Sequence, residues 1–251
     1  MEKQAILNKI KEKKELSSIP DSFILPFVEK HTPKNKELKK SDIKLIVSLV
    51  RSDLRRSTGM FQKSGEKLWK LRESLAKENK VDKLLETHLS TKERIQFYPK
   101  LKEIIFNLNP KSILDLGCGL NPLALASKEI KYYAVDIQQS DLDIVKQFFE
   151  KNNIHGKTIN LDVSKSLSSL PEADLCLALK LLDLLPLKAQ QAEKILSLNC
   201  KKFIFSFSTK TLSGKLMLHK KRLWLERVLH NKNIEFYTLS SDNEIFYIIE
   251  K

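Results

Sequence analysis

Two closely spaced glycines after an apolar run are the feature of the sequence best suited to hold a ligand. Residues 112–116 lead into Gly117 and Gly119, and a helix is expected to begin next, with Asn121 suited to cap it and Pro122 suited to its first turn. Glycine adopts positive φ without strain and lets a ligand approach the backbone closely. The pattern therefore predicts a ligand cradle between a strand and a helix.

Acidic residues at three strand ends indicate the chemistry of that ligand. Asp115 lies at the mouth of the glycine turn, and Asp136 and Asp162 end the next two strand candidates. The third glycine of the dinucleotide fingerprint is absent. A carboxylate at Asp115 would repel a pyrophosphate but attract the sulfonium and ammonium groups of S-adenosylmethionine. Asp136 could accept hydrogen bonds from ribose hydroxyls, and Asp162 could accept one from an adenine amino group.

Each of these acids alone is more often a turn or helix-capping residue, because aspartate favours turns for local reasons. Three acids at the carboxyl ends of successive strands, where open α/β sheets bind ligands, favour a shared site instead. We therefore predict an S-adenosylmethionine site. It is expected to include three apolar neighbours of the strand ends: Ile137, Val163 and Leu179.

The elements that position these residues follow an alternating pattern from about residue 90 onward. Short apolar runs bounded by turn residues alternate with helical segments, as in βα units of a mostly parallel sheet. The strand candidates are residues 112–116, 132–135, 158–161, 174–179, 202–207, 234–239 and 244–249. The last two are separated by a polar turn and should pair as an antiparallel hairpin. The predicted fold is α/β, with a doubly wound, mostly parallel, seven-stranded Rossmann-like sheet of the methyltransferase type.

Residues 1–89 are predicted to form a separate, basic helical domain, with residues 90–251 as the methyltransferase domain. Helical periodicity covers residues 41–56 and 66–87, whereas three prolines between residues 19 and 35 are expected to interrupt any helix there. Residues 1–100 carry 24 of the 45 Lys and Arg residues but only 14 of the 31 Asp and Glu residues. Such a field attracts a polyanion such as RNA, although a lysine-rich composition that only maintains solubility explains it equally well.

Several classes of protein are disfavoured by composition. No run of apolar residues is long enough for a membrane helix, and no apolar stretch typical of a secretory signal follows the first residues. The three cysteines are far apart and suggest neither a disulfide framework nor a zinc site. We expect a cytoplasmic, monomeric protein without a metal and with reduced, buried thiols.

Taken together, the motifs resemble a specific family, the aminoglycoside-resistance methyltransferases that modify N7 of a guanine in 16S ribosomal RNA. The resemblance begins at His88-Leu89-Ser90-Thr91-Lys92-Glu93-Arg94 and continues through Asp115-Leu116-Gly117-Cys118-Gly119-Leu120-Asn121-Pro122. It also covers residues 179–180, 185–186, 207–215 and 243–251. Blocks in this order are much harder to obtain by chance than one motif, and the family also carries a basic, ribosome-docking domain in front.

The resemblance implies a role for each matching residue. Arg94 would bind the methionine carboxylate of the cofactor, Gly117 and Gly119 would line it, Asp136 would hold its ribose, and Asp162 would contact its adenine. Lys180 would lie beside the target base. Because guanine N7 offers a lone pair without a proton, Lys180 is assigned to positioning the base or its phosphate rather than to proton transfer, with a solvated loop lysine as the alternative.

RNA contacts are expected from the segment after the fifth strand. The resemblance covers Lys210 and Lys215, although Lys215 replaces an arginine of the family pattern and cannot reproduce its two-pronged contact. Residues 215–231 are predicted to form one helix that exposes Lys220, Lys221 and Arg222 as a basic ridge toward RNA phosphates. A merely solvated helix face is the alternative.

The sequence thus predicts a methyltransferase acting on N7 of a guanine in 16S rRNA of the 30S subunit, with aminoglycoside resistance as the implied consequence. Two alternatives remain open. One is a methyltransferase of another RNA position or of a small molecule, although a small-molecule enzyme has no need for a strongly basic front domain. The other is a catalytically silent RNA-binding relative.

Overall fold

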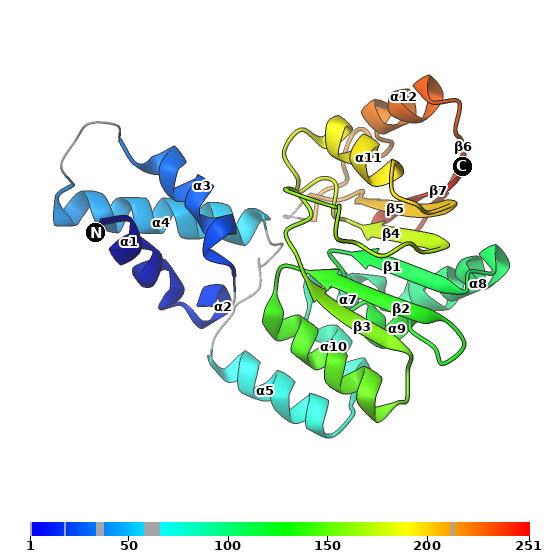
Figure 1. Cartoon of the computed structure of the whole chain (residues 1–251), viewed down its shortest axis with the longest axis horizontal. Coiled ribbons are helices and arrows are strands. Elements are labelled where there is room, and N and C mark those ends of the chain that lie inside the picture. Colours follow the sequence, from blue (N-terminus) through cyan, green and yellow to red (C-terminus); the bar gives the residue numbers. More distant parts are fainter. Residues whose placement is uncertain (1, 18, 34–37, 58–65, 212–213) are drawn as a thin grey trace.

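The computed structural model describes residues 2–17, 19–33, 38–57, 66–211 and 214–251. It has two parts, a bundle of helices at one end and an α/β layer structure at the other (Figure 1). The bundle contains α1 (Glu2–Lys11), α2 (Lys14–Ser17), α3 (Asp21–His31) and α4 (Lys40–Ser57). Its apolar faces meet in one core, which includes Ile6, Ile10, Ile24, Val50 and Leu54.

Of the three prolines expected to interrupt any helix between residues 19 and 35, Pro20 and Pro33 do flank α3. The prediction is wrong at Pro26, because α3 continues through it. Proline lacks the N–H that would bond the carbonyl four residues earlier, which is that of Ser22. Lys165, far along the chain, donates a hydrogen bond from its Nζ to that same Ser22 carbonyl. A partner from outside the helix therefore satisfies the group that Pro26 leaves free.

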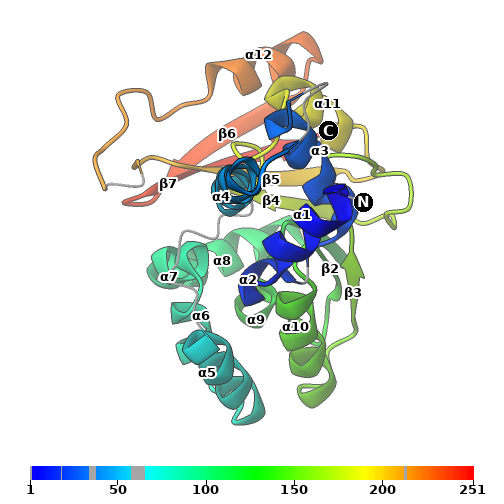
Figure 2. The ribbon, with the colours of Figure 1, turned by 90° about the vertical axis from the view of Figure 1, so that its left-hand side faces the viewer.

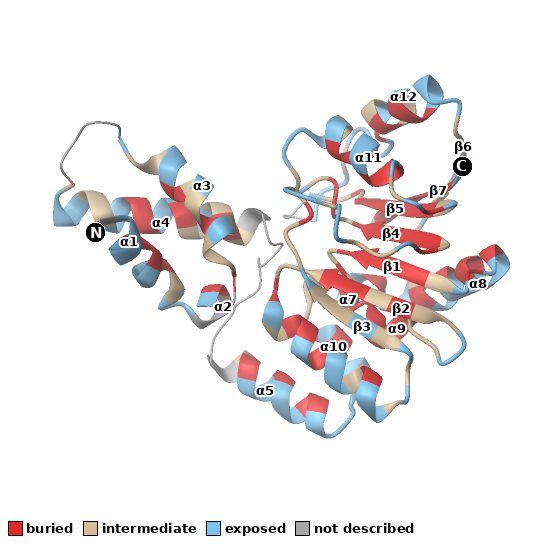
Figure 3. Ribbon diagram, in the orientation of Figure 1, coloured by how far each residue is buried: buried red, intermediate tan, exposed pale blue. Residues whose placement is uncertain are grey.

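The described strands form one sheet in the order β3-β2-β1-β4-β5-β7-β6. The first five run parallel, and β7 pairs antiparallel with both β5 and β6, which confirms the predicted closing hairpin. Their bounds are β1 (Ser112–Leu116), β2 (Lys131–Asp136), β3 (Gly156–Asn160), β4 (Leu175–Leu179), β5 (Lys202–Ser208), β6 (Glu235–Ser240) and β7 (Glu244–Glu250). Central strands such as β4 are buried along their whole length (Figure 3).

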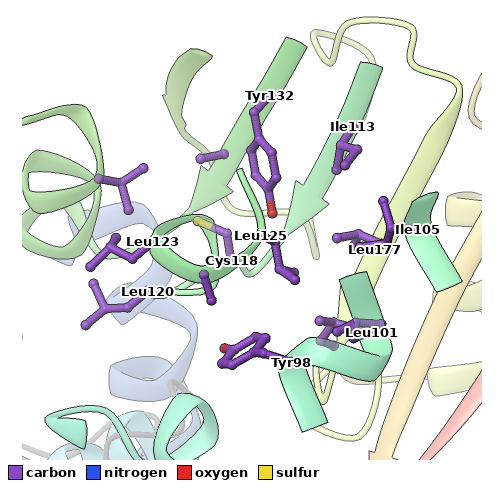
Figure 4. Close-up of a cluster of buried hydrophobic side chains, with 14 of the residues drawn as sticks. Tyr98, Leu101, Ile105, Ile113, Cys118, Leu120, Leu123, Leu125, Tyr132 and Leu177 are labelled. Carbon is purple, nitrogen blue, oxygen red and sulfur yellow. The ribbon is translucent and has the colours of Figure 1, made fainter. Parts of the chain in front are cut away.

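Helices cover both faces of the sheet, as predicted for a doubly wound fold. One face packs on helices α8 (Tyr98–Leu108), α9 (Pro122–Leu125) and α10 (Gln139–Lys151), and the other packs on α11 (Lys188–Leu196) and α12 (Leu223–Asn231). Figure 4 shows part of the first core, a cluster to which Tyr98 and Leu101 of α8 belong together with Cys118 and Tyr132. This packing fixes the position of the turn after β1.

The segment predicted as one helix over residues 66–87 is two helices, α5 (Glu66–Lys77) and α6 (Val81–Glu86). They are separated at Asn79, whose positive φ of 53° ends the first helix. Buried residues of both helices, including Leu75 and Leu85, belong to the core on the α8 side of the sheet. The domain boundary at residue 89 stays a prediction.

The helix predicted over residues 215–231 is also shorter than expected, because α12 begins only at Leu223. Just before this helix, the main-chain carbonyls of His219 and Lys220 accept hydrogen bonds from the Arg222 guanidinium. In the described part of the chain, they do not form the main-chain hydrogen bonds of a helix. Short α7 (Leu89–Arg94) and a 3₁₀ turn, η1 (Ile95–Phe97), lead into α8. Among the described residues, no helix combines the length and the apolar content needed to cross a bilayer.

Candidate active site

The glycine turn after β1 has the backbone that only glycine adopts easily. Gly117 and Gly119 have φ of +62° and +49°. A Cβ on Gly117 would lie 2.8 Å from Cδ1 of Leu181, and a Cβ on Gly119 would lie 3.3 Å from the His88 ring. The Cys118 N–H donates to the Val135 carbonyl at 3.0 Å, which ties the turn to β2. The turn therefore needs glycine at both positions, because a side chain would strain the backbone and collide with Leu181 or His88.

The turn opens onto a cavity of about 340 Å³ at the carboxyl ends of the parallel strands. Seven of the residues predicted to bind the cofactor line this cavity: Gly117, Gly119, Asp136, Ile137, Asp162, Val163 and Leu179. The cavity wall is mixed, with carboxylates on one side and apolar groups such as Leu161, Leu184 and Leu185 nearby. It can accommodate a ligand that has both polar and flat apolar parts.

Asp136 at the end of β2 is held by the backbone around the cavity. Its Oδ2 accepts a hydrogen bond from the Gly119 N–H and its Oδ1 accepts one from the Gln138 N–H, both at 2.8 Å. Burial raises the pKa of this carboxyl to about 6, and nearby Asp141 acts in the same direction. Because each carboxylate oxygen has more than one lone pair, both can still accept hydrogen bonds from a diol.

Asp162 has one oxygen available for a ligand. Its Oδ1 accepts hydrogen bonds from the N–H and the hydroxyl of Ser164. Its Oδ2 is buried and has no hydrogen-bond partner among the described residues, although Lys165 Nζ lies 3.8 Å away. A buried acceptor without a donor is costly unless a ligand supplies one. The site therefore fits a group that brings an N–H donor to this corner.

Asp115 lies behind the cavity and does not line it. The side chain is fully buried, and its Oδ2 accepts a hydrogen bond of 2.8 Å from the Tyr132 hydroxyl. Burial raises the pKa of this carboxyl to about 7. Asp115 is not among the residues that line the cavity, and its predicted contact with the cofactor stays a prediction.

Arg94 is likewise outside the cavity lining. Its guanidinium is fully buried and makes a two-pronged contact with Glu244 of β7, with 2.7 Å between Nη2 and Oε1. Nη1 donates to Oδ1 of Asn121, the residue just before α9, at 2.7 Å. In this arrangement Arg94 fastens the glycine turn to the last strand. Its predicted contact with a carboxylate of the cofactor stays a prediction.

Lys180 lines the cavity at the end of β4 in a left-handed conformation, with φ of 57°. Its N–H donates to the Ser206 carbonyl at 3.0 Å. Its Nζ lies 2.5 Å from a Glu93 oxygen and 3.6 Å from a Glu244 oxygen. The ammonium therefore sits at the cavity edge between two carboxylates, a geometry that suits positioning by charge.

Of the residues predicted to bind RNA, Lys215, Lys220 and Lys221 are exposed and Lys210 is half-buried. The prediction for Arg222 is wrong. Its guanidinium is buried against the Phe207 ring and bonds Asp183 at 2.7 Å and the Ser208 carbonyl at 2.9 Å. Because its guanidinium N–H groups donate to these acceptors and to the Lys220 carbonyl, Arg222 does not present them to an RNA phosphate.

Sequence reasoning gave no site role to several residues that line the cavity, among them His88, Phe23 and Phe27. His88 packs on the glycine turn, and burial lowers the pKa of its imidazole to about 4, which keeps the ring neutral. Phe23 and Phe27 reach the cavity from α3 in the bundle. The His88 segment was recognised as a motif without a role for the histidine. For the phenylalanines no sequence signal existed, because the prolines between residues 19 and 35 argued against a helix there and only the fold brings this segment to the cavity.

The glycine turn, the acids at successive strand ends and the antiparallel closing hairpin together define a Rossmann-like methyltransferase fold. The chain matches the family model described as "Ribosomal RNA methyltransferase (FmrO)" over residues 46–248. It belongs to this family.

Relatives and solved structures agree with this assignment. The chain is 36% identical over 139 residues to a 16S rRNA (guanine(1405)-N(7))-methyltransferase of Serratia marcescens, an alignment that covers 54% of the chain and 55% of the relative. A protein of the same name from Micromonospora rosea is 29% identical over 177 residues, which is 66% of the chain and 64% of that protein. The alignments thus span between about half and two thirds of the length of these relatives.

Structural similarity extends further along the chain. The 16S rRNA methylase RmtB superposes with a TM-score of 0.78 at 24% identity, covering 99% of this chain and 98% of that one. RmtF, solved in complex with S-adenosyl-L-homocysteine, gives a TM-score of 0.81 at 22% identity, with 99% and 98% covered. The helical bundle in front of the sheet therefore belongs to the fold that these proteins share.

Proposed function

We propose that the protein transfers a methyl group from S-adenosylmethionine to N7 of a guanine in 16S rRNA, at the position numbered 1405 in the names of its relatives. The observation that carries the proposal is the cavity at the strand ends. It combines a glycine turn, the Asp136 carboxylate and an Asp162 oxygen that lacks a donor. Small ribosomal subunits in the cytoplasm would be the substrate.

The residues present fit this cofactor. Asp136 would accept hydrogen bonds from the ribose hydroxyls, and Oδ2 of Asp162, which lacks a hydrogen-bond donor, would accept one from the adenine amino group. Gly117 and Gly119 would let the backbone approach the methionine part. The bound cofactor supplies an electrophilic methyl group on a sulfonium.

The remaining requirement is to position the base. Guanine N7 carries a lone pair and no proton, so no general base is needed, and holding the two reacting atoms in line can supply several kcal/mol. Lys180 stands at the cavity edge, where its ammonium would orient the base or its phosphate. The exposed Lys215, Lys220 and Lys221 are proposed to contact the RNA backbone near the site.

Two variants test the assignment of roles. Asp136→Ala should abolish binding of S-adenosylhomocysteine in calorimetry. Lys180→Ala should keep the cofactor affinity within about threefold and reduce methyl transfer to 30S subunits at least tenfold, because a lost charge-assisted contact is worth roughly 1.5–3 kcal/mol. Lys102→Ala, at an exposed lysine of α8, serves as the matched control and should change neither.

The alternatives give different results. A wild-type chain that fails to bind S-adenosylhomocysteine would be a silent relative. Transfer to a small metabolite but to no form of 16S rRNA would identify a small-molecule methyltransferase. Loss of cofactor binding in Lys180→Ala together with retained binding in Asp136→Ala would overturn the assignment of the two residues.

A further inference from the structure

The mouth of the cofactor cavity is built in part by the helical bundle. Phe23, Pro26 and Phe27 of α3 line the cavity together with residues 161–165, which follow β3. The carboxyl ends of the parallel strands point toward the bundle (Figure 1), and the view along that direction shows α1 and α3 in front of the sheet (Figure 2). The bundle is therefore part of the cavity wall and not a distant attachment.

Two further contacts fasten α3 to this place. Lys165 donates a hydrogen bond to the Ser22 carbonyl, the acceptor that Pro26 leaves without a helical partner. Ile137, directly after Asp136, packs against the apolar core of the bundle. The residues that join the two parts are thus neighbours of the two acids assigned to the cofactor, Asp136 and Asp162.

The two phenylalanines have a shape and chemistry that suit a flat ring. Their ring centroids lie 5.5 Å apart with an interplanar angle of 53°, and both side chains are only partly buried. They lie on the same cavity as the Asp162 oxygen that lacks a donor. An apolar aromatic wall beside one polar acceptor is the environment that an aminopurine requires, because its faces are apolar and its edge donates.

We propose that α3 completes the cofactor site, with Phe23 and Phe27 forming the wall against the adenine. This inference rests on the proposed function and extends it. Because the cofactor would contact both parts of the chain, its binding would also fix the bundle relative to the methyltransferase domain. By linkage, anything that fixes the bundle there would tighten cofactor binding by the same factor.

The coupling has a consequence for RNA binding. The bundle carries a mostly basic groove. Its lining includes Lys9 of α1, Glu12 and Lys13 just after α1, and Lys44, Arg51 and Arg55 of α4. If the cofactor orients the bundle, it also orients this groove relative to the active site. Loading with the cofactor would then prepare the RNA-binding face before the ribosomal subunit arrives.

Calorimetry with S-adenosylhomocysteine on the full chain tests the proposal. Phe23→Ala and Phe27→Ala should each weaken binding about tenfold, the loss typical of one aromatic contact. Phe27→Leu retains apolar packing in the bundle, but it should also bind S-adenosylhomocysteine more weakly because the ring is lost. Phe106→Ala is the matched control, since this phenylalanine of α8 is 80% exposed and lies outside the cavity lining.

Hydrogen exchange supplies a second measurement, and its result should not depend on the cofactor if Phe23 and Phe27 have only a structural role. Addition of S-adenosylhomocysteine should slow exchange in residues 21–31 of the wild type, and this protection should be reduced in the Phe23→Ala and Phe27→Ala variants. If the wild type does not bind, the proposed function fails. If the wild type binds and both variants match Phe106→Ala, with unchanged exchange in α3, the role of α3 is refuted while the proposed function stands.

Discussion

Replacement of Glu244 by glutamine probes the buried ion pair beneath the active site. The Arg94 and Glu244 side chains are 0% and 1% exposed, and Glu244 also accepts a hydrogen bond from Ser206 and lies 3.6 Å from Lys180 Nζ. Glutamine has nearly the same shape but no charge, so Glu244→Gln leaves the Arg94 guanidinium buried without its counter-charge. Removal of one partner of such a pair costs about 3–5 kcal/mol of unfolding free energy.

Urea unfolding of the wild type and of Glu244→Gln measures this cost. The same strand offers a matched control. Glu250 at the end of β7 is 56% exposed and lies 4.0 Å from Lys202. Glu250→Gln should therefore change the unfolding free energy by less than about 1 kcal/mol. Equal stability of the Glu244→Gln and Glu250→Gln variants would refute the reasoning, because it would show that the buried charge of Arg94 needs no partner.

Three further predictions follow from the site. Burial raises the pKa of Asp136 to about 6, and the ionised form is the better acceptor, so affinity for S-adenosylhomocysteine should fall several-fold as the pH drops from 8 to 5. Calorimetry at each pH should show this fall in the wild type and a clearly smaller one in Asp136→Asn, where Asp115 still titrates. Gly117→Ala should lower the unfolding free energy by about 1–2 kcal/mol and weaken binding of the cofactor. Gly214 also has a positive φ, but nothing lies within 4 Å of an added Cβ, so Gly214→Ala should leave the cofactor affinity unchanged. Arg222→Ala should destabilise the fold by about 2–4 kcal/mol in urea unfolding, because Asp183 loses its buried partner and keeps only Lys188, whose side chain is 45% exposed. The exposed Lys221→Ala should leave stability unchanged and reduce only RNA binding in a filter assay.

The sheet could be predicted well because its signals are local. Alternation of apolar runs with turn residues located each of the seven strands in the described part of the chain, and the polar turn at residues 240–243 indicated the antiparallel hairpin. The glycine turn was equally local, since two glycines between a strand and a helix have few other uses. Asp136 and Asp162 followed from their positions at strand ends, and both line the cavity.

The errors arose where tertiary contacts overrule local preference. Pro26 fits inside α3 because Lys165, distant in sequence, bonds the carbonyl that proline leaves free. Arg222 looked like part of a basic ridge, but its partner Asp183 could not be identified from spacing. Phe23 and Phe27 lie in a segment where prolines were expected to interrupt any helix, and neither residue was given a role. That they face the cavity depends on how the bundle meets the sheet, which no periodicity encodes.

The most direct test of the central claim is to locate the methylated atom. Purified 30S subunits would be incubated with the protein and S-adenosylmethionine, and N7-methylguanine in 16S rRNA would be mapped by borohydride and aniline cleavage followed by primer extension. The account predicts one strong stop at guanine 1405 that is absent with Asp136→Ala. A subunit without any new N7-methylguanine, or an equal stop with the Asp136→Ala variant, would contradict it.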